Sequence, residues 1–212
     1  MKGVITGDIV RSTAVGPALR TRLLEAVRKT AQELEMLSDL KIELYRGDSF
    51  QILVDDPVQA LRIAVLLRAG LRCNTPDREK SRWDARLAVG VGEIEYASGE
   101  VATSDGPAFR NSGREFDELG KKRLAVRTPW PEVNDELRVS TAFADDVISG
   151  WTPRQSPALY LSLLHPMNQR EIAAVLSQSG QNVSKLLGAG REPLIRLYLE
   201  RYELLVSRKI AP

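Results

Sequence analysis

Cysteine and histidine are nearly absent, because the 212 residues contain one of each, Cys73 and His165. A lone cysteine excludes a disulfide within the chain and fits a reducing cytoplasm. A single histidine argues against a His/Cys zinc site and against a Ser-His-Asp triad. A metal ion would therefore be held by carboxylates, and oxygen ligands favour magnesium or manganese.

Long apolar runs are also missing, and no segment approaches the roughly 20 apolar residues that a spanning helix needs. The N-terminus meets an acidic residue, Asp8, too early for a signal peptide. We therefore expect a cytoplasmic protein with no membrane partner. The net charge of +2 is unevenly spread: residues 151–212 hold eight Lys/Arg and four Asp/Glu, against 22 and 24 in residues 1–150. This asymmetry points to an anionic partner for the C-terminal part.

Hydrophobic periodicity predicts an alternation of strands and helices over residues 1–130. We expect helices over 18–37, 57–73 and 107–119, and strands over 3–10, 40–54 (a hairpin), 85–94 and 123–128. The order β-α-β-β-α-β, followed by a helix and a strand, predicts an α+β domain. Its plan would be ferredoxin-like, an antiparallel sheet with helices on one face.

The chain after residue 130 is expected to be helical. A junction over 131–152 follows Pro129 and Trp130, begins at Pro131 and holds a short helix at about 137–149. Residues 153–212 then form a small all-α domain. The expected domains are thus 1–130, the junction, and 153–212.

Two aspartates stand out by position in the first domain. Asp8 ends the first strand and Asp48 lies at the hairpin tip, so neighbouring strands can bring both carboxylates together. Such a pair could hold one or two magnesium ions and clamp a triphosphate. The alternative is that Asp8 caps a turn and that Asp48 is an ordinary hairpin-tip residue.

Two further features add to this hypothesis. Gly90 and Gly92 leave one face of their strand without side chains, and the usual reason is close approach of a ligand or of another backbone. Arg110 and Arg114 are one helical turn apart, which suits a phosphate clamp. A solvated helix face explains the arginine pair equally well.

Four motifs on successive elements strengthen the hypothesis: GDIVRST at 7–13, YRGDSF at 45–50, RLAVGVGE at 86–93 and DGPAFRNSGR at 105–114. In order, they resemble the Asp-Ile-x-x-x-Thr signature, the Gly-Asp hairpin, the Arg-x-x-x-Gly-x-x-x-Gly strand region and the Gly-x-Ala-x-Asn-x-x-x-Arg helix of class III nucleotidyl cyclases. With the added C-terminal helices, the chain resembles the SatD family over nearly its full length.

The resemblance implies a role for each matching residue. The implied metal-binding residues are Asp8, Ile9 and Asp48. The implied nucleotide-binding residues are Thr13, Gly47, Gly90 and Gly92. Arg114, with Arg110 beside it, would be the catalytic pair, and Arg114 would stabilise the transition-state phosphate of a partner's nucleotide, because cyclase domains share their sites head to tail.

Three departures concern the residues that handle the ribose and the base. Arg110 replaces the asparagine that orients the ribose, Leu44 replaces the lysine that reads adenine, and Pro107 replaces an aspartate that helps to select the base. Nucleotide binding is therefore favoured over cyclisation of ATP.

Residues 168–187 show a helix-turn-helix pattern. Asn168 caps a helix that begins at Gln169, the turn Ser177-Gln178-Ser179-Gly180 follows, and a second helix begins at Gln181. The segment resembles the Gln-x-Glu-Ile-Ala…Leu…Gln-x-x-Val-Ser-Lys pattern of many bacterial regulators. The predicted DNA-binding residues are Gln169, Gln181, Asn182, Ser184 and Lys185. Such three-helix units also serve as protein-docking or dimerisation modules, so that alternative stays open.

These observations favour a dimeric, DNA-binding transcriptional regulator with a cyclase-like, nucleotide-sensing N-terminal domain. The alternative is an enzyme, a metal-dependent nucleotidyl cyclase or oligonucleotide synthase that acts on nucleoside triphosphates. A third hypothesis is an interaction protein in which both parts are scaffolds.

Overall fold

The computed structural model describes residues 1–12, 16–45, 47–77, 79, 82–95 and 105–211. Within these ranges the chain forms a five-stranded mixed sheet and eight helices. In chain order the elements are β1 (Lys2–Ile9), α1 (Pro17–Leu34), β2 (Leu40–Leu44), β3 (Ser49–Val54), α2 (Ala60–Cys73), β4 (Ala85–Gly92), α3 (Pro107–Asp117), β5 (Leu124–Arg127), α4 (Pro131–Gly150), α5 (Ser156–Leu164), α6 (Gln169–Val175), α7 (Gly180–Ala189) and α8 (Glu192–Ile210).

The strands lie in the order β2-β3-β1-β4-β5. β1 is central and antiparallel to both β3 and β4, and β2 and β3 form the predicted hairpin. β5 runs parallel to β4, so the prediction of an antiparallel sheet is wrong at this edge. The reason is the connection: α3 returns the chain to the starting end of β4, and a strand after such a crossover runs parallel to the one before it.

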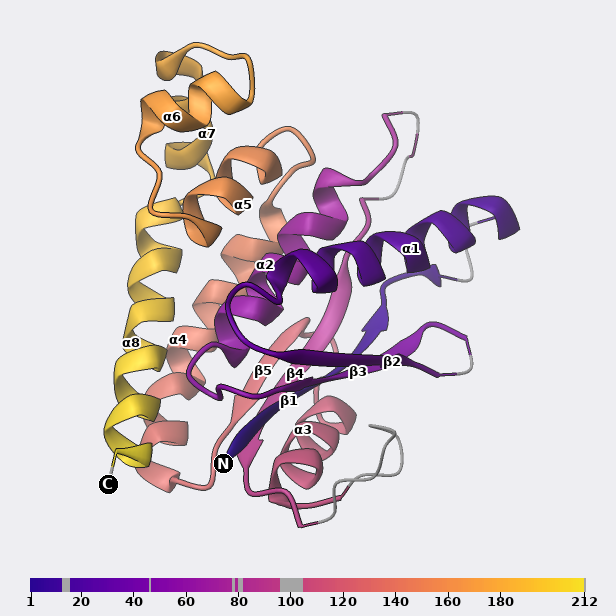
Figure 1. Ribbon diagram of the computed structural model, residues 1–212, viewed down its shortest axis with the longest axis vertical. Coiled ribbons are helices and arrows are strands. Elements are labelled where there is room, and N and C mark those ends of the chain that lie inside the picture. Colours follow the sequence, from indigo (N-terminus) through magenta and orange to yellow (C-terminus); the bar gives the residue numbers. More distant parts are fainter. Residues whose placement is uncertain (13–15, 46, 78, 80–81, 96–104, 212) are drawn as a thin grey trace.

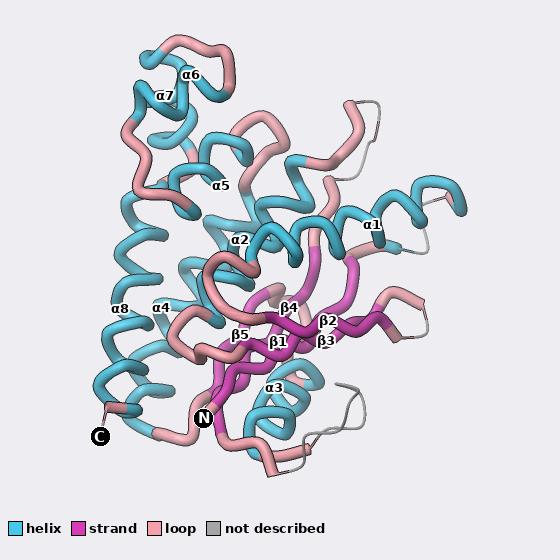
Figure 2. Tube along the Cα trace, viewed as in Figure 1, coloured by secondary structure: helices cyan, strands magenta, loops and turns pink. Residues whose placement is uncertain are grey.

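The two faces of the sheet are covered by different helices (Figures 1 and 2). Side chains alternate along a strand, and in β1 the set represented by Ile5 and Ile9 joins the main core with α1 and α2. The other set, represented by Val4 and Thr6, meets α3. Helices therefore cover both faces, and the expectation of helices on one face is wrong for α3.

The packing of α3 explains the two glycines of β4. A Cβ atom at Gly90 would lie 2.3 Å from the backbone nitrogen of Ser112, and one at Gly92 would lie 2.6 Å from that of Ala108. Atoms cannot approach so closely without a shift of the helix backbone. Of the two reasons that a bare strand face allows, close approach of another backbone is the one observed.

The C-terminal helices continue the core of the α/β part. α4 is a 20-residue helix, longer than the short helix expected at about 137–149. One buried cluster extends from the sheet through α2 to α5 and α8. Tyr202 on α8 donates a hydrogen bond of 2.8 Å to the carbonyl of Pro57, and the Trp151 indole donates one of 2.8 Å to the carbonyl of Gly190. Among the described residues, this one cluster has members on both sides of the expected boundary at residue 153.

A buried ion cluster ties α4 to the sheet. Asp84, which precedes β4, accepts hydrogen bonds from Arg68 at 2.9 Å, from Arg72 at 2.7 Å and from Arg123 at 2.9 Å. Arg68 also donates to Asp145 on α4 at 2.7 Å. Burial alone would raise the pKa of Asp84, but the surrounding arginines hold that pKa below its usual value.

Within the part of the chain that the structure describes, no helix is both long enough and apolar enough to cross a membrane.

Candidate functional site

The two aspartates singled out by the sequence lie side by side at one end of the sheet. Asp8 is paired with Ser49, the residue after Asp48, in the β1–β3 register. The backbone nitrogen of Ile9 donates a hydrogen bond of 3.2 Å to the carbonyl of Asp48. The strand pairing therefore places the backbones of the two residues next to each other, and the charges of both carboxylates act on Arg86.

A positive charge lies next to this pair. Arg86 is directly opposite Asp8 in the β1–β4 register, and its Nε donates a hydrogen bond of 2.9 Å to Asp8 Oδ1. Its Nη2 bonds the second carboxylate oxygen, so the contact is bidentate. The hydrogen bond to Asp8 and the charges of Asp8 and Asp48 raise the pKa of Arg86.

The cluster is partly open to solvent. The side chains of Arg86 and Asp8 are 36% and 18% exposed. The guanidinium of Arg86 also lies 5.4 Å from the centre of the Phe116 ring on α3, a cation–π contact that fixes its direction. Asp48 accepts a hydrogen bond from the hydroxyl of Ser12. A small ligand could reach these carboxylates without unfolding the domain.

A row of hydrogen-bonded polar side chains lies beside Asp8 on the sheet face that α3 covers. Tyr45 donates to Gln51 at 2.6 Å, Gln51 donates to Thr6 at 3.1 Å, and the hydroxyls of Thr6 and Ser112 are 2.9 Å apart. Burial, together with the charge of Glu43, raises the pKa of Tyr45 to about 12, so Tyr45 stays a hydrogen-bond donor at neutral pH. Donors and acceptors thus line the surface between β2 and α3.

The carboxylate oxygens of the acid pair are ligands of the type that magnesium or manganese prefers, but the carboxylate of Asp8 is already bound to Arg86. Asp8 and Asp48 supply the hard oxygen ligands that these ions prefer. Both oxygens of Asp8, however, are hydrogen-bonded to Arg86, so a metal ion would have to displace this guanidinium. Within the described ranges, no group of three or more His, Cys, Asp or Glu side chains could hold a metal ion.

The remaining predicted residues of this site lie in three different settings. Ile9 follows Asp8 and its side chain is buried in the core. Gly47 has φ +96°, a conformation that favours glycine, in the hairpin turn beside Asp48. Thr13 lies outside the described residues. Gly90 and Gly92 face α3, so the protein's own helix fills the space that a nucleotide was expected to use.

The two arginines of α3 have different surroundings. Arg110 pairs with Glu95 at 3.0 Å and with Asp105 at 3.3 Å, so acidic side chains already hold it. Arg114 is exposed, and no ion pair of its side chain is found among the described residues. To bind a phosphate together with Arg114, Arg110 would have to leave these carboxylates.

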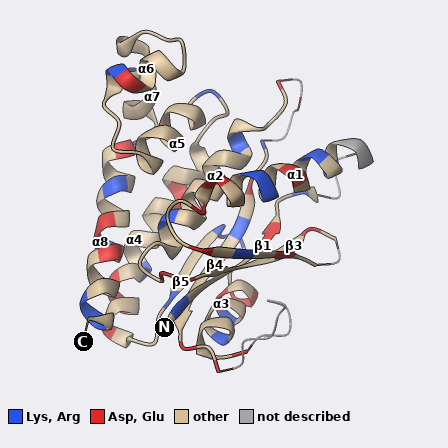
Figure 3. Cartoon of the chain, in the orientation of Figure 1, with Lys and Arg blue, Asp and Glu red and all other residues tan. Residues whose placement is uncertain are grey.

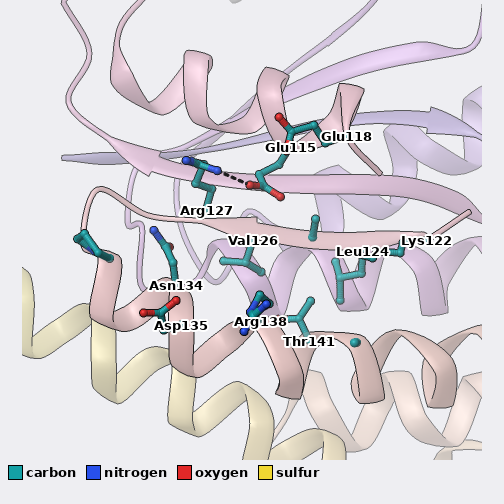
Figure 4. A pocket seen from close by; sticks show the side chains of 13 residues that line it. Glu115, Glu118, Lys122, Leu124, Val126, Arg127, Asn134, Asp135, Arg138 and Thr141 are labelled. Atoms are coloured by element: carbon teal, nitrogen blue, oxygen red, sulfur yellow. Dashed lines mark hydrogen bonds and ion pairs between the residues drawn. The ribbon is translucent and has the colours of Figure 1, made fainter. Parts of the chain in front are cut away.

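A separate cavity of about 480 Å³ lies between α3, β5 and α4 (Figure 4). Its lining mixes charges of both signs, and Arg127 pairs with Glu115 at 2.7 Å across one wall. None of the site residues predicted from the sequence contributes to this lining.

The predicted helix-turn-helix segment is formed by α6 and α7. Asn168 and Glu171 form a reciprocal capping box at the start of α6, and Ser179 caps α7 through the backbone nitrogen of Asn182. Ser177, with φ +52°, turns the chain between the two helices. The small core between them is supplied by Ile172, Ala173, Val183, Leu186 and Leu187.

The residues predicted to contact DNA lie mostly on the surface. Gln181, Ser184 and Lys185 are exposed along one face of α7, and Gln169 is exposed at the start of α6. Asn182 is half-buried, and its amide donates a hydrogen bond of 2.8 Å to Gln178 in the turn. Four of the five predicted side chains are therefore free to meet a partner, while Asn182 already has one.

Sequence reasoning missed the functional neighbours of the acid pair. Two of the sequence motifs contain Arg86 and Ser12, but neither motif predicts a contact with Asp8 or Asp48. The single signal available was the position of Arg86 one residue into a strand. Its pairing with Asp8 depends on the β1–β4 register, which no local pattern reveals.

Comparison with known proteins adds no relative to this description: no protein-family model matches the chain, and no curated protein matches it.

Proposed function

We propose that this protein is a DNA-binding transcriptional regulator in which α6 and α7 contact duplex DNA and the α/β part senses a nucleotide. One observation carries the DNA part. The exposed face of α7 carries polar side chains that can pair with base edges or phosphates, namely Gln181, Ser184 and Lys185, while its large apolar side chains are buried.

The geometry of this face suits the major groove. In a helix-turn-helix the second helix enters the groove with its N-terminal residues at the base edges. Gln181 lies in the first turn of α7, where an amide could bond an adenine edge. Lys185 lies one turn later, where a phosphate contact would fix the register.

Charge limits how such a complex would behave. Figure 3 shows few charged residues on α6 and α7, and more along α8. The exposed cations on α6, on α7 and in the short link after α7 are Arg170, Lys185 and Arg191. Three phosphate contacts predict a slope of log K against log salt of about −3 for one copy and about −5 for two copies. Binding should therefore depend on salt, but less steeply than for strongly basic regulators.

The test is fluorescence anisotropy with a pool of random-sequence duplexes, titrated between about 50 and 200 mM salt. Lys185→Ala should weaken binding and lower the slope by about 1 per copy, because one phosphate contact is lost. Gln181→Ala should leave the binding of random DNA almost unchanged but remove the preference for any sequence that selection enriches.

The matched control is Arg208→Ala, which removes the same charge from the exposed far end of α8. Binding that is absent at low salt, or that falls equally in Lys185→Ala and Arg208→Ala, would contradict the proposal and favour a protein-docking role for α6 and α7.

The sensing part rests on the acid pair. The strand order β2-β3-β1-β4 is compatible with the ferredoxin-like plan, and the pairing of Asp8 with Ser49, next to Asp48, supports the acid pair that the resemblance to nucleotidyl cyclases implies. With Mg²⁺ or Mn²⁺ displacing Arg86, the two carboxylates would hold the ion. The ion would neutralise the phosphates of the nucleotide.

A second candidate function is catalytic, a metal-dependent nucleotidyl cyclase or oligonucleotide synthase. The same acid pair favours it, but the residues that would read the base do not. Leu44 packs against the apolar core, Pro107 begins α3, and Arg110 is held by two acidic side chains. Binding of a nucleotide as a signal therefore has more support than catalytic conversion of a nucleotide.

Incubation with each of the four nucleoside triphosphates and Mn²⁺ separates these candidates. We expect a raised melting temperature and no new product on chromatography. Asp8→Asn and Asp48→Asn should abolish the thermal shift, because each removes half of the carboxylate charge. A product that disappears in both variants would establish the enzyme, and no shift with any nucleotide would contradict nucleotide binding.

A further inference from the structure

An exposed apolar surface lies on α4 and α8. We refer to it as the α4/α8 patch. Its five large side chains, with their exposed fractions, are Val139 (56%), Phe143 (72%), Leu194 (60%), Leu197 (63%) and Leu204 (41%). Phe143, Leu194 and Leu197 surround one hollow of about 390 Å³, and Val139 and Leu204 follow at helical spacing on the same two helices.

The two helices lie side by side and antiparallel along one side of the molecule (Figure 1). Buried side chains of both helices, such as Ala144 and Ile195, belong to one core cluster and hold this arrangement. Three polar contacts accompany the packing: Lys209 with Glu132, Arg201 with Glu136, and Tyr198 with Thr141 at 2.7 Å. The patch is thus part of a rigid surface and is not a loose end of the chain.

The charges beside the hollow are neutralised within the chain. Glu136 and Arg201 both border the hollow, and they pair with each other. The surface therefore offers apolar contact without a net charge that would attract DNA or a charged peptide. Its occupant must itself be apolar and nearly neutral at this position.

We infer that a second copy of this chain covers the α4/α8 patch about a two-fold axis. Scaled by their exposed fractions, the five side chains offer on the order of 500 Å² of apolar surface, at the upper end for a typical monomer. A standard interface takes about 800 Å² from each partner, of which roughly 60% is apolar. The patch supplies this amount, and a two-fold contact matches a surface to itself.

The position of the patch in the chain supports the same occupant. Only Gly190 and Arg191 separate α7 from α8, so a dimer formed through the first turns of α8 sets the distance and direction between two α7 helices. Two α7 helices about 34 Å apart could read successive major grooves. This part of the inference rests on the proposed DNA-binding function, whereas the dimer itself does not.

The experiment is light scattering and sedimentation equilibrium on the full chain at micromolar concentration. We expect twice the chain mass of 23.5 kDa. Phe143→Asp and, independently, Leu197→Asp should give the single-chain mass, because a charge would be buried without a partner. The matched control is Met36→Asp, which places the same charge at a 62% exposed side chain outside the patch and should leave the dimer intact.

Because Phe143 and Leu197 are exposed, neither substitution opens a core cavity, and circular dichroism should show unchanged helix content. A wild-type monomer, or a dimer that survives both substitutions, would overturn the inference. The DNA-binding proposal can fail independently of the dimer inference. If the wild-type dimer does not bind DNA, the dimer inference stands alone. If Phe143→Asp is a monomer, and its slope of log K for DNA binding against log salt is about half that of the wild type, both the dimer and the DNA-binding proposals are supported.

Discussion

Two clusters of aspartate and arginine lie near the same end of the β1–β4 strand pair, and they differ chiefly in burial. Asp84 and its partners Arg68 and Arg72 are almost completely excluded from solvent. Asp8 and Arg86 form an equally direct contact, but both remain partly exposed. The same type of ion pair thus has different consequences. Removing one member of the buried pair strongly destabilises the fold, whereas in the half-exposed pair a ligand can replace the arginine at small energetic cost.

Substitution of asparagine for Asp84 and for Asp8 should give the largest difference in the free energy of unfolding. Asp84→Asn leaves three arginines around an uncharged amide, and we expect the free energy of unfolding to fall by about 3–5 kcal/mol. Asp8→Asn should cost only about 0–1 kcal/mol, because water screens the exposed pair. Urea unfolding followed by circular dichroism measures both. Equal losses would remove the distinction between the clusters.

The same contrast should depend on pH in a defined direction. The pKa of Asp84 is lowered below its usual 3.8 in the folded protein. Its contribution is therefore fully present above about pH 3.8 and is lost as the pH falls through the lower, folded-state pKa. The difference in unfolding free energy between wild type and Asp84→Asn should stay constant from neutral pH to about 4 and narrow only below it.

A smaller effect is expected when the arginine of the exposed cluster is removed. Arg86→Met leaves Asp8 and Asp48 as adjacent uncompensated carboxylates, so Mg²⁺ no longer has to displace a guanidinium. We expect the apparent affinity for Mg²⁺, measured by thermal shift, to rise about tenfold, the equivalent of about 1.4 kcal/mol.

Arg127→Met provides the control for this variant. Arg127 is as exposed as Arg86, at 36%, and is paired with Glu115 on the same sheet face. Its loss should not change the response to Mg²⁺. An unchanged response in Arg86→Met as well would show that the acid pair does not hold a metal ion.

Much of the fold followed from local patterns. The alternation of Phe50, Ile52 and Val54 predicted β3, and the capping residue Asn168 predicted where α6 begins. The nearness of Asp8 and Asp48 was predicted because a hairpin that joins its neighbouring strand brings such positions together. All of these signals are carried by residues close to each other in sequence or by one simple pairing rule.

The errors concern contacts between distant segments. The direction of β5 and the face that α3 covers depend on how a crossover packs against the finished sheet, and Gly90 could not reveal whether a ligand or a helix approaches it. The length of α4 was underestimated, because its packing on β5 and α8 stabilises turns that its own sequence marks weakly.

The amino-acid sequence by itself determined the alternation of strands and helices, the helix-turn-helix pattern and the acid residues at strand ends, because each depends on periodicity, capping or turn chemistry. Only the tertiary structure decided which charges are paired and buried. Registers between strands place Arg86 on Asp8, and helix packing encloses Asp84, and these contacts join residues 12 to 78 positions apart.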